Sequence, residues 1–220
     1  MGILNVKEEK SLLSKNFFFL GTVFVIMLNF IMFNYFNEPI EFDQINNWEN
    51  CFDFRNLVIH FLSAFRHSND QHVILNSLCF LIAGGYVERR CGSIKLLALV
   101  FIFALFGESM TAANHTGTGG RGFSGVNYSF YAYIIVDFIF SFKSIKAEKR
   151  ELVLSIIVLC LIYLASCFCG GTKTFAFAFY PYDLMYNLGH YTGFLSGLIL
   201  TVIMKICKME SKGKNYGNYC

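Results

Sequence analysis

A series of long apolar runs is the feature that most constrains this chain. The first run, residues 16–36, is uncharged for about 20 residues, enough to cross the roughly 30 Å hydrocarbon core of a bilayer. It lacks a small-residue cleavage site, so we interpret it as a retained helix and not as a signal peptide. The sequence therefore predicts an all-α polytopic membrane protein with six transmembrane helices, at about residues 16–36, 72–88, 95–113, 123–142, 151–169 and 186–206.

The composition agrees with this class. Hydrophobic residues make up 55% of the chain and charged residues 15%, with only two prolines, which favours long helices over a loop-rich soluble fold. The formal net charge of +3 comes from basic residues spread along the chain, so no nucleic-acid partner is expected. The lipid bilayer is the expected surrounding.

The distribution of Lys and Arg predicts the orientation. Basic residues gather in both ends of the chain and in the connections after the second and fourth predicted helices. The other connections hold only Arg55, Arg66, Arg121 and Lys173, although they include the longest, residues 37–71. Because cytoplasmic loops collect Lys and Arg, we expect both termini in the cytoplasm. This predicts one membrane domain, residues 16–207, between cytoplasmic tails at 1–15 and 208–220.

Polar residues near the starts of three predicted helices point to a site. With this topology the second, fourth and sixth helices all run inward, so His72, Ser124 and His190 should lie at one level near the outer face. Eighteen helical steps from Ser124 to Phe142 span about 27 Å, which places Ser124 a few Å below the outer surface. Polar residues are costly in such segments unless they have a function. A hydrolytic site here would need a cavity open to the outside.

Glycines explain how two of these helices could approach. Gly189, Gly193 and Gly197 recur every four residues, the small-residue pattern that lets membrane helices pack closely. Gly125 could supply the matching gap beside Ser124. A stripe that serves only packing is the alternative, but the adjoining His190 needs a hydrogen-bond partner if it is buried.

A serine next to a histidine predicts nucleophilic catalysis. The hydroxyl of Ser124 becomes a nucleophile when a base such as His190 takes its proton. His72 and Asn76, spaced i and i+4, could both donate to an oxyanion, as could the backbone N–H of Ser124. Asp137 and Asp183 are not placed to complete a triad, so a dyad is expected.

Other patterns are weaker. Residues 117–122 match G-x-G-x-x-G, but a membrane helix and not a strand precedes them, so a flexible loop is favoured over a nucleotide site. Histidines at 67, 72, 115 and 190 lack a zinc motif, and no metal or cofactor is expected. The eight cysteines match no zinc spacing and are interpreted as packing residues or free thiols. We assign no role to Glu108, and His60 is interpreted as an ordinary loop or interface residue.

Four segments together resemble the rhomboid family of intramembrane serine proteases. Residues 72–76, HVILN, resemble the family's HxxxN; residues 122–125, GFSG, its GxSG; and residues 189–193, GHYTG, with Gly197, its last-helix motif. Residues 84–93, GGYVERRCGS, resemble its GGxxEkrxGS element. The resemblance spans roughly residues 60–200 in order. The family's Trp-Arg pair is missing from the first long loop, where Val58-Ile59 stand.

The resemblance implies a role for each matching residue. Ser124 would be the nucleophile and His190 the general base and acid, while His72, Asn76 and the Ser124 amide would form the oxyanion hole. Tyr128 would pack against the catalytic imidazole. The supporting residues would be Gly122, Gly125, Gly189, Gly193 and Gly197, and the structural ones Glu88 and Arg90.

The resemblance also implies substrates and a location. It implies an endopeptidase that cuts single-span membrane proteins near the outer face, and the six-span form resembles that of prokaryotic plasma membranes. The site would open to the extracytoplasmic side. Two rivals remain: a non-catalytic rhomboid-like protein that binds transmembrane helices, and a channel or transporter, which would need several intramembrane charges along a pathway.

Overall fold

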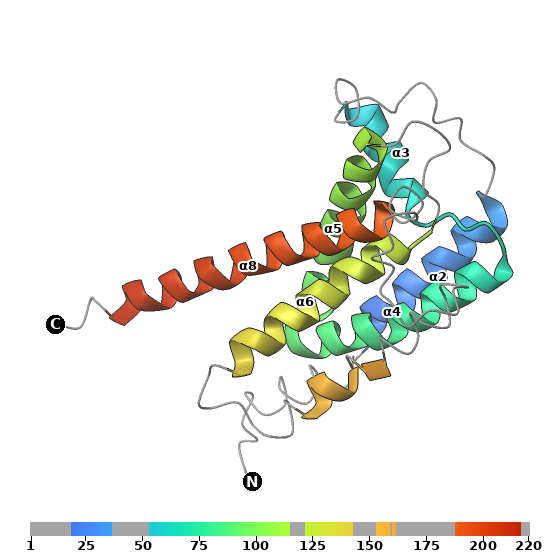
Figure 1. The fold of residues 1–220 in the computed structure, drawn as a ribbon. Helices are drawn as coiled ribbons and strands as arrows, with labels where there is room; N and C mark the ends of the chain where they lie inside the picture. Colours follow the sequence, from blue (N-terminus) through green and yellow to red (C-terminus); the bar gives the residue numbers. More distant parts are fainter. Residues whose placement is uncertain are drawn as a thin grey trace, which may run out of the picture.

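The computed structural model describes residues 19–36, 53–114, 122–142, 153–158, 160–161 and 188–216. Within these ranges all regular structure is α-helical. The helices are α2 (Leu20–Tyr35), α3 (Phe54–Ser63), α4 (Asp70–Cys91), α5 (Ser93–Asn114), α6 (Ser124–Phe142) and α8 (Leu188–Tyr216). Residues 153–158 and 160–161 are helical as well. The all-α expectation is therefore confirmed for the described part of the chain (Figure 1).

The boundaries of α4 follow from local chemistry. Asn69 caps its start, because the side-chain Oδ1 accepts a hydrogen bond of 2.9 Å from the His72 backbone N–H. Gly92 ends it with a positive φ of 83°, and its N–H donates to the Glu88 carbonyl at 2.7 Å. The chain then turns directly into α5 at Ser93. The long helix pair is thus set by one capping amide and one glycine.

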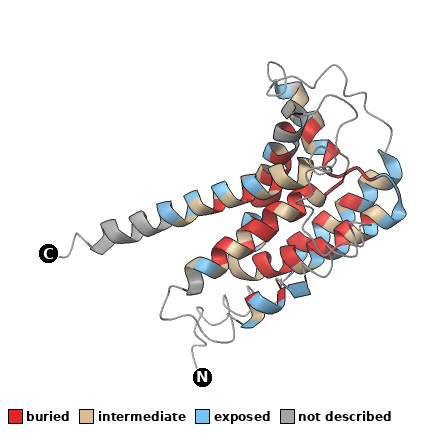
Figure 2. Cartoon of the chain, viewed as in Figure 1, coloured by how far each residue is buried: buried red, intermediate tan, exposed pale blue. Residues whose placement is uncertain are grey.

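Helix α6 lies in the middle of the bundle. It packs against α4, α5 and most extensively α8, while α2 lies on α4 and α5, and α3 on α5 (Figure 1). Phenylalanines fill the space between these helices: Phe80 and Phe103 both meet Phe130 edge-to-face, at ring-centroid distances of 5.5 and 5.1 Å. Buried residues line the inner sides of α4 and α6 (Figure 2). The core therefore forms around α6.

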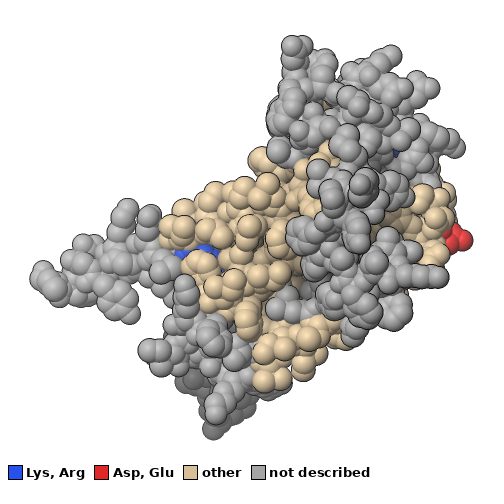
Figure 3. Space-filling view, in the orientation of Figure 1, with Lys and Arg blue, Asp and Glu red and all other residues tan. Residues whose placement is uncertain are grey.

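Besides the apolar core, the helices bury several polar residues and expose many large apolar ones. In α2, Thr22 and Asn29 are fully buried, whereas Phe24 and Met27 are more than half exposed. Large apolar side chains are also exposed on α4, α5, α6 and α8, and the face shown in Figure 3 carries few charged atoms among the described residues. Large apolar side chains exposed on so many helices indicate a surface that is covered by something other than water.

Long apolar helices are fewer than the sequence predicts. In the described ranges, Leu188–Cys207 is the only segment that meets both the length and the hydropathy expected of a membrane span. Leu20–Tyr35 and Ser93–Gly107 are apolar but shorter. Polar residues at both ends of α4, including Asp70, Glu88, Arg89 and Arg90, lower its mean hydropathy. The count of six spans, like the division into one domain and two tails, stays a prediction.

Helix α3 and the end of α8 differ most from the expected helices. Helix α3 lies within the predicted connection 37–71, which therefore carries structure of its own. Helix α8 continues to Tyr216, about three turns past residue 206 and into the predicted tail. Neither glycine nor proline occurs from 198 to 212, and Lys and Glu favour helix once a helix has begun, so the helix continues through most of this stretch; Gly213 lies within its last turn. In Figure 1 this end of α8 projects away from the other helices.

Candidate active site

Three helix starts meet at one end of the bundle. His72 is the third residue of α4, Ser124 the first of α6 and His190 the third of α8. Gly122 precedes α6 with a φ of 125°, a conformation that side chains other than glycine rarely adopt. It turns the chain so that α6 begins at the serine. The structure thus brings together the three residues that the sequence placed at one level, at what we call the Ser124 end.

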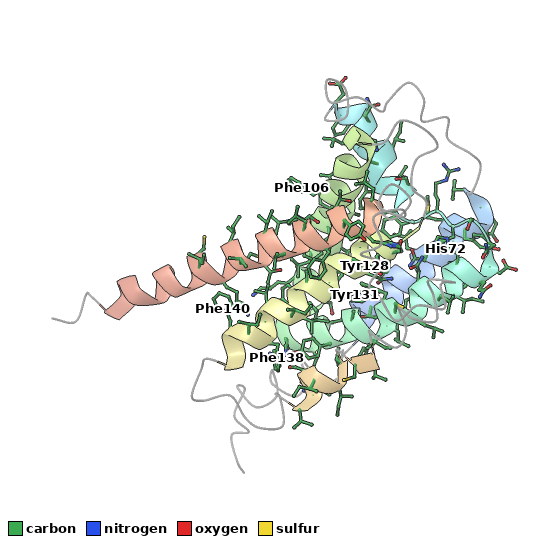
Figure 4. All side chains as sticks on the ribbon, viewed as in Figure 1. His72, Phe106, Tyr128, Tyr131, Phe138 and Phe140 are labelled. Atoms are coloured by element: carbon green, nitrogen blue, oxygen red, sulfur yellow. The ribbon has the colours of Figure 1, made fainter. Side chains whose placement is uncertain are left out.

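Ser124 and His190 lie in hydrogen-bonding contact. The His190 Nε2 is 3.0 Å from the Ser124 Oγ, and both residues are partly buried. The Tyr128 ring, one turn after the serine (labelled in Figure 4), stacks on the imidazole with a centroid distance of 4.5 Å and an interplanar angle of 8°. In the described part of the chain no carboxylate contacts His190. The contact is a serine-histidine pair held on one side by an aromatic ring.

Glycine allows α8 to reach α6. A Cβ at Gly193 would lie 2.8 Å from the Gly125 carbonyl carbon, and one at Gly197 would lie 2.6 Å from the Ser129 Cα. Both positions therefore require glycine, because the obstructing atoms are backbone. Ser129 adds a hydrogen bond of 2.7 Å from its hydroxyl to the Gly193 carbonyl. These contacts set the distance between the serine helix and the histidine helix.

Gly189 has a smaller structural part in this packing. It directly precedes His190, and its carbonyl lies 3.3 Å from the Thr192 hydroxyl, which donates more closely, at 2.9 Å, to the Leu188 carbonyl. Gly107 of α5 faces the same helix, since a Cβ there would lie 3.8 Å from the Gly193 Cα, an ordinary contact. Close approach is therefore confined to the α6 side of α8.

Donors from α4 border the space beside Gly122. A Cβ added to Gly122 would lie 2.7 Å from the His72 Nε2 and 3.3 Å from the Asn76 Nδ2. The Ser68 hydroxyl is 3.1 Å from the His72 Nδ1, so a hydroxyl proton donated there leaves the ring proton on Nε2. Asn76 is buried, and its Nδ2 has no hydrogen-bond partner among the described residues. Two N–H donors thus lie next to the loop that carries Ser124.

His67 holds the same loop, and the sequence reasoning considered it only as a zinc ligand. Its Nδ1 is 3.2 Å from the Phe65 carbonyl, and its Nε2 accepts a bond of 3.4 Å from the Phe123 N–H. This pair of bonds requires a neutral ring, and burial, followed by the charge of nearby His72, lowers the pKa of His67 to about 3. Its spacing of five residues before His72 is no recognisable signal, so only the fold places it here.

Asn127 is a second residue that the sequence reasoning missed. It is buried, and its Nδ2 donates to the backbone carbonyl of Asn76 at 3.0 Å and lies 3.4 Å from the Asn76 Oδ1. A signal was present in the sequence, because an amide three residues after Ser124 in an apolar helix is an expensive residue.

The predicted structural residues lie at the opposite end of α4. Glu88 accepts bonds from the Gly21 N–H, the Thr22 N–H and hydroxyl, and the Ser93 hydroxyl, at 2.5 to 2.8 Å. It thereby caps the start of α2, where Phe19 offers no side-chain cap. Arg90 donates to the Asp137 Oδ2 at 2.6 Å, and Lys205 binds the other oxygen of this carboxylate. Asp137 therefore pairs with two cations, Arg90 and Lys205, far along α6 from Ser124. We call this part of the bundle, with Glu88, the Asp137 end.

Several predicted features lie outside the described residues. These are His115, residues 117–121 of the glycine-rich stretch, Asp183, and the cysteines at 51, 167, 169 and 220. Of Glu108 only the backbone is described, as part of α5. Within the described ranges Cys79, Cys91, Cys160 and Cys207 form no disulfide, and His60 is buried in α3. The described residues contain no cluster of three or more His, Cys, Asp or Glu that could hold a metal ion.

The arrangement has the parts that acyl transfer needs. A hydroxyl touches an imidazole, which can take its proton, and N–H donors border the neighbouring space, where negative charge on a substrate oxygen would develop. The serine amide is the first of its helix and has no partner within that helix. Chemically, the site can perform attack by Ser124 on a carbonyl carbon.

Comparison of the sequence with known proteins places the chain in a family. A model of the rhomboid domain matches residues 55–206. Over 75 residues the chain is 35% identical to the rhomboid protease GlpG of Klebsiella pneumoniae, covering 34% of this chain and 27% of the relative. The GlpG of Yersinia pestis is 34% identical over 74 residues, covering 32% of this chain and 25% of the relative. The chain thus spans about a quarter of the length of these curated relatives.

The matched domain and the observed helices agree in extent. The matched domain begins within α3 and ends within α8, and it therefore includes Ser124, His190 and the helix starts around them. It covers well over half of the 220 residues. The chain therefore belongs to the rhomboid family, and with it to the integral membrane proteins.

Proposed function

We propose that this protein is an intramembrane serine endopeptidase that uses Ser124 as nucleophile and His190 as general base and acid. The observation that carries the proposal is the 3.0 Å contact between the His190 Nε2 and the Ser124 Oγ. The two residues are 66 positions apart in sequence, and close glycine packing of α6 on α8 brings them together. The curated relatives named as rhomboid proteases support the same reaction class.

The proposed reaction proceeds through an acyl-enzyme. His190 takes the hydroxyl proton at Nε2 as the Ser124 Oγ attacks the scissile carbonyl carbon. The His72 Nε2–H, the Asn76 Nδ2–H and the Ser124 amide donate to the oxygen that becomes negative. When the intermediate collapses, the imidazolium returns its proton to the leaving amine. A water, deprotonated by His190, then attacks the ester, and the departing Ser124 oxygen recovers the proton.

The Tyr128 ring would hold the imidazole during these transfers. Stacked at 4.5 Å and nearly parallel, it restricts the imidazole plane to orientations in which Nε2 faces the serine. No carboxylate in the described residues performs this task, so the aromatic face takes the orienting part. A dyad with an aromatic support is therefore the mechanism we propose.

The proposed substrates are single-span membrane proteins cut in or near their transmembrane segment. The proposed topology has six spans, both termini in the cytoplasm and the site open to the extracytoplasmic side of a prokaryotic plasma membrane. The Lys and Arg distribution supports it, as does the parallel direction of α4, α6 and α8, whose first turns meet at the Ser124 end. The six-span core would be the rhomboid-like domain at residues 16–207. No cofactor or metal enters the proposal.

The proposal is tested with the full chain in liposomes and a transmembrane reporter substrate. Ser124→Ala and His190→Ala should each lower kcat/KM by about 10³-fold or more, because each member of such a unit is needed for the attack. Unchanged cleavage in either variant would sink the dyad. Binding of transmembrane helices without any cleavage by the unaltered protein would instead favour the non-catalytic alternative.

A further inference from the structure

Asn127 connects the serine helix to the candidate oxyanion donor. It lies on α6 one turn after Ser124, and its side chain reaches the Asn76 residue of α4. Its Nδ2 is 3.0 Å from the Asn76 backbone carbonyl and 3.4 Å from the Asn76 side-chain oxygen. Both residues are buried, at 1% and 7% exposure, so water does not compete for these bonds.

The backbone carbonyl decides how both amides are turned. A carbonyl oxygen can only accept, so the Asn127 atom that faces it must be the NH2 group. That same group faces the end of the Asn76 side chain, which must therefore present its oxygen. The Asn76 NH2 group is then turned away from Asn127. The Asn76 backbone carbonyl thus sets the orientation of two side-chain amides, those of Asn127 and Asn76.

The Asn76 NH2 group consequently points toward the reacting groups. It would lie 3.3 Å from a Cβ at Gly122, next to the loop that leads into Ser124, and has no partner among the described residues. A buried NH2 group without a partner costs free energy. Such a donor is useful where a ligand oxygen arrives to meet it. Turned over, Asn76 would present an oxygen that repels the oxyanion.

We propose that Asn127 is a positioning residue that holds the Asn76 amide with its donor toward the oxyanion, an inference that rests on the proposed function. The site requires no polar side chain at this position for packing, since the Asn127 Oδ1 has no partner in the described structure and buried apolar residues, Val126 and Phe130, lie nearby on the same helix. An apolar residue of equal size would fill the same space.

The test compares Asn127→Leu, which keeps the volume and cannot donate, with Asn127→Ala, which avoids overpacking. Both variants should lower kcat by about tenfold with KM changed less than twofold, because the oxyanion forms only in the transition state. The rate of labelling of Ser124 by a fluorophosphonate should fall in parallel. Ser77→Ala, next to Asn76 on α4 and also buried, serves as the control and should match the unaltered protein.

A double-mutant cycle separates positioning from a merely structural role. If Asn127 acts through Asn76, then Asn76→Ala with Asn127→Leu should be no slower than Asn76→Ala alone. Additive losses in the double variant would overturn the inference. An unaltered kcat in Asn127→Leu or in Asn127→Ala would also overturn it, as would a loss of activity seen only in Asn127→Leu. If Ser124 is labelled and cleavage depends on it while Asn127→Leu is normal, only this inference fails. If cleavage does not depend on Ser124, the proposed function fails and this inference falls with it.

Discussion

The two ends of the bundle treat polar groups differently. At the Asp137 end both carboxylates have their oxygens occupied: Arg90 and Lys205 bind the two oxygens of Asp137, and four donors bind the Glu88 carboxylate. At the Ser124 end the side chains include a hydroxyl, an amide and imidazoles, and the Asn76 NH2 group has no partner among the described residues. Helices α4, α6 and α8 contribute to both ends, and α2 and α5 add the donors to Glu88.

The difference separates stability from reactivity. An ionic cluster whose carboxylates are all paired holds helices together but leaves no hydrogen-bonding group free for a substrate. An unsatisfied donor, in contrast, weakens the fold and can bind a developing charge. We therefore expect substitutions at the Ser124 end to lower turnover more than stability, and those at the Asp137 end to do the opposite. Substitutions that reverse this order would break the comparison.

After the dyad residues themselves, the largest effect is expected where the glycine contact sets the dyad distance. Gly193→Ala should lower kcat/KM by about 10²-fold or more, because its Cβ would meet the Gly125 backbone and push His190 away from Ser124. Gly107→Ala is the matched control, since its Cβ finds ordinary contact distance on the other side of α8. Reporter cleavage in liposomes measures both. Equal rates for the two variants would show that helix spacing does not control the site.

A smaller loss is expected at the unpartnered donor. Asn76→Ala should lower kcat by about 10- to 10²-fold, because the transition state loses one hydrogen bond. Its melting temperature in detergent should fall by no more than a few degrees, since the removed NH2 group has no hydrogen-bond partner in the part of the fold that the structure describes. A variant with normal turnover and greatly lowered stability would place Asn76 among the structural residues instead.

The Asp137 end should respond in stability. Asp137→Ala leaves Arg90 and Lys205 without their carboxylate, and we expect it to cost about 2 kcal/mol, less than for a fully buried pair because both cations are partly exposed. Turnover of the folded fraction should change less than twofold. Lys205→Met should cost less, since Arg90 still neutralises Asp137. Denaturant titration in detergent provides the measurement, and a tenfold fall in turnover would contradict the separation of the two ends.

The smallest effect is expected from pH. The fold lowers the pKa of His67 from 6.5 to about 3. Between these two pH values His67 is therefore protonated in the unfolded chain and neutral in the folded chain. Stability from this group is complete above about pH 6.5 and declines as the pH falls, by about 1 kcal/mol between pH 7 and 5.5. His67→Gln should remove that part of the slope. Identical pH slopes in the two proteins would show that His67 is not held neutral.

The candidate pair was predictable from sequence because membrane segments reveal depth. Ser124 and His190 both stand a few residues into apolar runs of the same direction, and Gly193 and Gly197 form a visible four-residue spacing. Helix α3 and the extension of α8 were not predicted, since neither has the length of apolar sequence that marks a span. Asn127 and His67 were missed because their hydrogen-bond partners, Asn76 and Phe123, lie far away in the sequence.

By itself the sequence determined the class of fold, the four rhomboid-like segments and which ends of the helices carry polar groups. These depend on hydrophobicity and spacing along one chain, which are local properties. Only the tertiary structure decided that the His190 Nε2 lies 3.0 Å from the Ser124 Oγ, that Asp137 takes two cations, and which way the Asn76 amide faces. Those outcomes require two or three helices at backbone contact, and hydrogen-bond direction exists only once donor and acceptor have met.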